Sequence, residues 1–108
     1  MEFAIPVLKF AEALPNRPSG RAIAGQTSRS GPAVAANYRA ALRAKSRADF
    51  ISKITTVLGE ADETAFWLEL AERAGLMSAK RLAGLRQEAK ELIKIFNRTR
   101  TTARNHKS

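Results

Sequence analysis

Residues 46–75, SRADFISKITTVLGEADETAFWLELAERAG, are predicted to form one long helix. Ser46 can cap its start with Asp49 three residues on, and Gly75 is suited to end it because glycine adopts the left-handed conformation at little cost. The helix would be about 43 Å long at roughly 1.5 Å per residue, so other helices must lie along it. Apolar residues recur every three or four positions on its face: Phe50, Ile54, Leu58, Ala61, Ala65 and Leu68.

Three more helices are predicted around this one. A short helix covers residues 3–14. A second runs from residue 19 or 20 to about residue 44, with a kink or break at Gly31–Pro32 because proline has no N–H to donate. The last helix begins after Ser78, which can cap it. Its amphipathic stripe consists of Leu82, Leu85, Ala89, Leu92, Ile93 and Phe96.

The connections between these helices are short, and short connections imply antiparallel neighbours. No stretch alternates as a strand does, so we predict an all-α, antiparallel up-down four-helix bundle with a short first helix. Residues 1–97 form this single domain. Residues 98–108 form a basic tail without acidic residues, which is expected to fray or be disordered beyond about Arg100.

Charge is the strongest signal in the composition, with a net charge of +9 over 108 residues. It is unevenly distributed: residues 1–59 carry +6, residues 60–77 carry −4 and residues 78–108 carry +7. Such a balance favours a polyanionic partner, and the alternative is a basic surface that only keeps the protein soluble.

Several classes of function are disfavoured by what the chain lacks. It has no cysteine, which rules out disulfides and thiolate metal sites, and its one histidine, His106, lies near the C-terminal end. No apolar run reaches the length of a membrane span, and the N-terminal residues do not resemble a secretory signal. We expect a cytoplasmic protein that is not an enzyme and that uses no cofactor or metal ion.

A longer pattern is present in residues 26–70: Q-x-x-RSGPAVAANYRAA-x-RA-x-S-x-x-DF-x-x-K, followed by EADET-x-FWLEL. It resembles the family named for the 23S ribosomal RNA intervening sequence proteins. These are four-helix bundles whose fold is shared by the accessory variability proteins of diversity-generating retroelements. The chain departs from the family pattern at Pro32 or Ala33, where serine or threonine is usual, and at Ala40, where glutamate is usual. The resemblance implies a homopentamer with a basic surface that binds RNA or DNA and, in the retroelement branch, partnership with a reverse transcriptase.

Glu60 and Glu63 share one side of the long helix and could suggest paired carboxylates for acid–base catalysis. The chain offers no cysteine, suitably placed histidine or set of metal ligands as a partner, so a structural role is favoured over catalysis, with solvated charge as a further alternative. We predict a polar network that fixes helix register, in which these carboxylates pair with side chains of the preceding helix: Arg29, Asn37 and Arg39.

Phe66, Trp67 and Leu70 are predicted to lie in the core or in a subunit interface rather than to stack on bases. Adjacent residues cannot point in one direction on a helix, so one ring is expected to face the bundle and the other a neighbouring subunit. Closing a single small bundle would leave part of this apolar group exposed. A cyclic homo-oligomer is therefore predicted, with five subunits by resemblance.

Basic residues are the candidates for contacting nucleic acid. Those around the second connection, from Arg39 to Arg47, are equally consistent with phosphate contacts and with solvated charge at a helix end. The predicted function is non-specific binding of the phosphate backbone, and the alternative is an adaptor bundle that docks a protein partner. The candidates are Arg39, Arg43, Lys45, Arg47, Lys80, Arg81, Arg86, Lys90, Lys94, Arg98, Arg100, Arg104 and Lys107.

Overall fold

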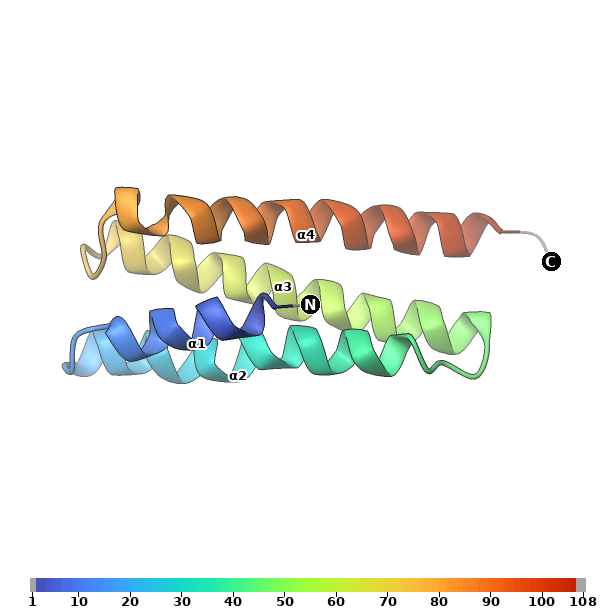
Figure 1. Cartoon of the computed structure of the whole chain (residues 1–108), viewed down its shortest axis with the longest axis horizontal. Coiled ribbons are helices and arrows are strands. Elements are labelled where there is room, and N and C mark those ends of the chain that lie inside the picture. Colours follow the sequence, from blue (N-terminus) through green and yellow to red (C-terminus); the bar gives the residue numbers. More distant parts are fainter. Residues whose placement is uncertain (1, 107–108) are drawn as a thin grey trace.

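The computed structural model describes residues 2–106, which form four α-helices and no strand. The helices are α1 (Ala4–Ala13), α2 (Pro18–Ala41), α3 (Arg47–Arg73) and α4 (Ala79–Asn105). Successive helices run in opposite directions, and together they form a rod of 51 × 20 × 18 Å (Figure 1). The pairs α1–α2, α2–α3 and α3–α4 pack against each other. The predicted all-α, four-helix architecture is confirmed.

Local signals set the ends of α3 and the start of α4 as the sequence predicts. The Ser46 hydroxyl accepts the backbone N–H of Asp49 at 3.0 Å, and the Ser78 hydroxyl accepts that of Arg81 at 3.2 Å. Gly75 has a φ of 73°, a conformation that side chains other than glycine's rarely adopt. The N–H of Leu76 then bonds back to the carbonyl of Ala71 at 2.9 Å, which closes the end of α3.

α2 is one uninterrupted helix, so a break at Pro32 is not observed. The missing N–H of Pro32 costs the helix one bond, to the carbonyl of Ser28, and Ser28 is exposed to water. Packing on both sides holds the segment in place. A Cβ on Gly31 would lie 2.5 Å from Cγ1 of Val7 in α1, and Ser30 bonds to Thr64 of α3 at 2.7 Å with both residues fully buried.

α4 continues to Asn105, so the prediction of fraying beyond about Arg100 is wrong. Its inward face keeps a seven-residue spacing to the end, from buried Leu82, Ala89 and Phe96 to half-buried Ala103. The Arg47 guanidinium also donates to the backbone carbonyl of His106, which ties the end of α4 to the start of α3. Packing thus extends the helix through a segment whose composition favours disorder.

The short first helix divides the rod into two halves. α1 has 10 residues, whereas α2 has 24 and α3 and α4 have 27 each, so α1 accompanies only the first part of α2 (Figure 1). We call residues 2–35 and 59–95 the four-helix half, and residues 36–58 and 96–106 the three-helix half. The buried apolar residues of the three-helix half are Ala41, Ile54, Val57, Leu58 and Phe96, whereas the four-helix half contains the rest of the core.

Candidate nucleic-acid interface

Antiparallel folding concentrates the positive charge at one end of the rod. Among the described residues, the three-helix half has eight Lys or Arg against one acidic residue, a net charge of +7. The four-helix half has ten against nine, a net charge of +1. The end of α2, the start of α3 and the end of α4 meet in the three-helix half, so basic segments far apart in the sequence share one end of the rod (Figure 1).

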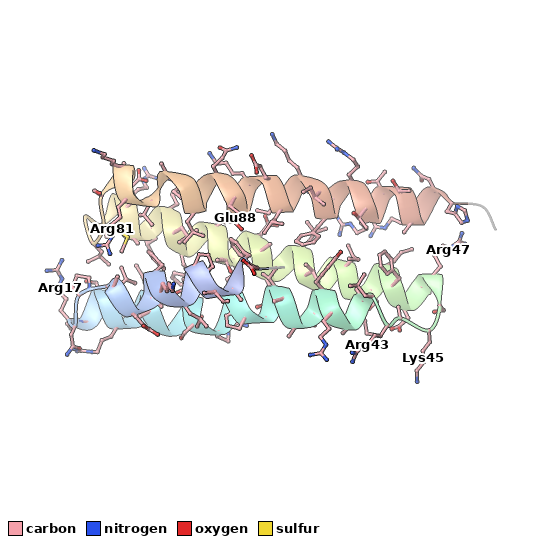
Figure 2. All side chains as sticks on the ribbon, in the orientation of Figure 1. Arg17, Arg43, Lys45, Arg47, Arg81 and Glu88 are labelled. Carbon is pink, nitrogen blue, oxygen red and sulfur yellow. The ribbon has the colours of Figure 1, made fainter. Side chains whose placement is uncertain are left out.

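One part of the surface at this end is a hollow of about 390 Å³ between α2 and α3, which we call the α2–α3 groove. Ala36 and Ala40 are its small residues, and Asp49 is its one acid. Figure 2 shows Arg43 and Lys45 pointing to the same side of the rod at this end. The cations that line the groove are Arg39, Arg43, Lys45 and Lys53.

Asp49 is already engaged within the α2–α3 groove. Its carboxylate accepts a hydrogen bond from Lys53 and one from the backbone N–H of Lys45 at 3.1 Å. These two bonds, first the one from Lys53, lower the pKa of Asp49. The carboxylate therefore stays ionised but is compensated locally, and Arg39, Arg43 and Lys45 form no salt bridge with any residue in the described part of the chain.

Arg47, predicted to belong to the same cluster, lies elsewhere. It points away from Arg43 and Lys45 toward the end of α4 (Figure 2), where its guanidinium donates to the carbonyl of His106. The predicted cluster is thus divided between two faces. Lys53 takes the fourth place in the groove, and its spacing of four from Asp49 and eight from Lys45 is the signal that could have identified it.

The basic residues of α4 have two different environments. Arg86 donates to Glu72 of α3 at 2.8 Å, and Arg100 donates to Asn97 at 3.3 Å. Lys107 lies outside the described residues. The other α4 candidates are exposed: Lys80, Arg81, Lys90 and Lys94 in the four-helix half, and Arg98 and Arg104 in the three-helix half.

The predicted polar network is present in part. Arg29 donates to Glu60 at 2.9 Å and to Glu63 at 2.6 Å, and Trp67 Nε1 also donates to Glu63 at 3.3 Å. The bond from Arg29 is the main reason that the pKa of Glu63 is lowered, and both carboxylates raise the pKa of Arg29. This network joins α2 to α3 near the middle of the rod.

Asn37 and Arg39 are not members of the network, so their predicted pairing with the carboxylates is wrong. The Asn37 amide donates to the carbonyl of Ala33 on its own helix at 2.8 Å, and Arg39 lines the α2–α3 groove. Both residues lie two or more turns beyond Arg29, out of reach of Glu60 and Glu63 in this antiparallel register. The buried bond between Ser30 and Thr64, which sequence reasoning missed, provides the polar contact in the core instead.

The two aromatic rings face different directions, as adjacent helical positions require. Trp67 packs partly against the core, whereas Phe66 is 52% exposed and Leu70 is 37% exposed. The rings meet edge to face with centroids 4.9 Å apart. Phe66 also lines a hollow beside Arg86 and Lys90 of α4.

The described residues define the chemistry that is available. Residues 2–106 contain no cluster of three or more His, Cys, Asp or Glu side chains that could hold a metal ion. None of the four helices is both long and apolar enough to cross a membrane within that range. What the surface does supply, at the three-helix half, is a dense set of guanidinium and ammonium donors suited to anionic oxygens.

Known proteins that are similar to this chain identify its family. The family model described as 23S rRNA-intervening sequence protein matches residues 1–98. A crystal structure of a protein of unknown function from the S23 ribosomal protein family of Bacteroides thetaiotaomicron is similar, with 35% identity, 88% of each chain covered and a TM-score of 0.82. No curated protein matches the chain. Because the family match spans nearly the whole chain and its fold agrees with that structure, the chain belongs to the 23S rRNA-intervening sequence protein family.

Proposed function

We propose that this protein binds RNA or DNA without sequence preference, through contacts between the three-helix half and backbone phosphates, and that it is not an enzyme. The observation that carries the proposal is the charge of +7 in that half against +1 in the other. Contacts to phosphate carry no sequence information and release condensed counterions, so a surface of this kind gives affinity that falls steeply with salt.

Assembly is the second part of the proposal. We infer a cyclic homo-oligomer, a pentamer by family resemblance, in which exposed Phe66 and Leu70 contribute to the subunit interface. Several three-helix halves on one strand would raise the apparent affinity through effective concentration. Light scattering after gel filtration tests this part, and a mass near 11.8 kDa at micromolar concentration would contradict it.

An adaptor that docks an acidic protein, such as a reverse transcriptase, is the second candidate. The same basic half supports it, because cations also complement carboxylates. The two candidates differ in a simple measurement: nucleic acid of arbitrary sequence binds in the first case only. A reverse transcriptase could also be a partner of the nucleic-acid-binding form, as the resemblance to retroelement accessory proteins suggests.

The test compares two variants. One loses four exposed cations of the three-helix half, and the other loses four exposed cations of the four-helix half. Because the same net charge is removed, the difference between them reports location alone. Measurements of affinity for duplex DNA across a salt series give the number of phosphates neutralised from the slope. The three-helix variant carries Arg43→Gln, Lys45→Gln, Arg98→Gln and Arg104→Gln. The matched control carries Lys9→Gln, Arg17→Gln, Lys80→Gln and Lys94→Gln, all at exposed positions.

The three-helix variant should have a slope shallower by up to about 3.6, since each lost duplex phosphate contact removes about 0.9, whereas the control should change by less than about 1. Equal changes in both variants would contradict the assignment of binding to one half. Absence of binding by the unmodified protein even at ~50 mM salt would replace this proposal with the adaptor.

A further inference from the structure

On one side of the α2–α3 pair, the α2 cation of the four-helix half is paired with carboxylates of α3, whereas the α2 cations of the three-helix half are not. Arg29, Ala36 and Arg43 are spaced by seven residues, about two helical turns, so they share one face of α2. In the four-helix half, the carboxylates of Glu60 and Glu63 on α3 meet this face and compensate Arg29.

In the three-helix half the same face is open. The α2–α3 groove has four cations against Asp49, whose carboxylate is already held by Lys53 and by the backbone N–H of Lys45. Alanines at positions 36 and 40 leave the hollow of about 390 Å³ free of larger side chains. No carboxylate in the described residues plays the part there that Glu60 and Glu63 play for Arg29.

We propose that the α2–α3 groove is a binding site for a backbone phosphate of a bound nucleic-acid strand, which we call the phosphate site. This inference rests on the proposed function and adds a location and a mode of contact to it. Arg39 and Arg43 present guanidinium groups that match two phosphate oxygens at once, and Lys45 adds a point charge from the connection, while Lys53 neutralises Asp49. The phosphate provides the missing anionic partner.

The decisive variant is Ala40→Glu, which places a carboxylate in the groove itself. Ala40 is half-buried on α2, and Ala36→Glu, at an exposed position of the same groove, serves as a second test if the first variant folds poorly. Ala83→Glu, at an exposed position of α4 in the four-helix half, changes the net charge equally and is the matched control. Ala40→Gln adds the same bulk without the charge.

Affinity for labelled single-stranded RNA and duplex DNA is measured by fluorescence anisotropy over a salt series. Ala40→Glu and Ala36→Glu should each weaken duplex binding about eightfold at ~0.1 M salt and reduce the slope by about 0.9, the effect of losing one phosphate contact. Ala83→Glu and Ala40→Gln should stay within about twofold of the unmodified protein, because neither places charge in the groove. Melting curves monitored by circular dichroism verify that each variant is folded.

The outcomes separate this inference from the proposed function. If the unmodified protein binds but Ala40→Glu and Ala36→Glu behave as Ala83→Glu does, the assignment of the phosphate site to the groove is wrong. Binding by the three-helix half then still stands. If Ala40→Gln weakens binding as much as Ala40→Glu, the bulk of the side chain rather than its charge is responsible, and the phosphate site is also contradicted. If the unmodified protein does not bind at ~50 mM salt, both proposals fail.

Inorganic phosphate distinguishes a strand from a free anion as the ligand. Millimolar phosphate, exchanged for chloride at constant ionic strength, should leave strand binding unchanged within about twofold, because a single free anion lacks the neighbouring contacts of a polymer. If phosphate displaces the strand from the unmodified protein but not from Ala40→Glu, the strand and the free anion compete for the groove, which supports the phosphate site. If phosphate displaces the strand equally from both proteins, the competition lies elsewhere and the assignment to the groove is overturned.

Discussion

The four-helix half and the three-helix half differ both in what they bury and in what they expose. The first includes α1, holds most of the core and has a net charge of +1, whereas the second buries five apolar residues and has a net charge of +7. Repulsion among like charges destabilises a compact state. In the three-helix half, strong repulsion is therefore opposed by a core of five buried apolar residues, a combination that is typical of a surface kept for binding rather than for stability.

The largest predicted effect tests how far the three-helix half depends on a single side chain. Phe96 is 2% exposed and its ring lies 5.6 Å from that of Tyr38. Phe96→Ala should lower the free energy of unfolding by about 3–5 kcal/mol, measured by urea denaturation, because it leaves a cavity in a small core. Its neighbour Ile95 is 51% exposed, so Ile95→Ala should cost far less. Equal costs would mean that this half is not packed as described.

A second prediction tests the attachment of α1, which defines the four-helix half. Gly31→Ala would place a Cβ 2.5 Å from Val7 Cγ1, an overlap that should cost about 1–3 kcal/mol of stability. Gly59→Ala on α3 meets open space and should instead stabilise the fold by up to about 1 kcal/mol through helix propensity. Below its melting temperature, the Gly31 variant should bind nucleic acid normally, since α1 does not reach the α2–α3 groove. Lost binding would show that the two halves are coupled.

The smallest effect concerns pH, because Arg29 is 51% exposed and such pairs contribute little. The pKa of Glu63 is lowered from its ordinary value of 4.5, chiefly by the hydrogen bond from Arg29. The bond therefore adds stability that is present above pH 4.5 and is lost as the pH falls through the lower, folded-state pKa. The small difference in melting temperature between the unmodified protein and Glu63→Gln should thus shrink in acid. A difference that persists at all pH values would mean that Glu63 acts through packing.

Asp49 provides the matching measurement in the three-helix half. Its pKa is lowered from 3.8, first by Lys53, so its stabilising contribution is also lost as the pH falls below that value. Asp49→Asn should slightly destabilise the fold, whereas it should strengthen binding to nucleic acid because it removes the one carboxylate of the α2–α3 groove. Glu63→Gln should leave binding unchanged. Weaker binding by Asp49→Asn would contradict the role of the groove.

The sequence allowed the helices to be predicted because their signals are local. Ser46, Ser78 and Gly75 act on the backbone within a few residues of themselves, and apolar spacing identifies the inward face of each helix. The pairing of Arg29 with Glu60 and Glu63 also followed, since all three lie on the facing sides of adjacent helices.

What the sequence did not reveal depends on how the helices are rotated and aligned against each other. Two helical turns separate Asn37 from the carboxylates that it was expected to meet. The side chains of Lys45 and Arg47 point to different faces of the rod, although the two residues are only two positions apart in the sequence. The end of α4 is helical because packing along its inward face and the contact with Arg47 outweigh a composition that favours disorder. The charge difference between the halves arises in the same way, from antiparallel folding rather than from any one segment.

That charge difference gives the rod an electric dipole moment along its 51 Å axis. In the field of a polyanion the molecule turns before it touches, so that the three-helix half arrives first. Mobile ions limit this alignment to about 8 Å from the surface at physiological salt and to about 30 Å at ~0.01 M. Ionic strength therefore governs the angle of first encounter as well as its frequency. Under the proposed function, the protein would meet a nucleic acid already oriented at low salt, whereas in concentrated salt it would have to find the binding orientation by rotational search.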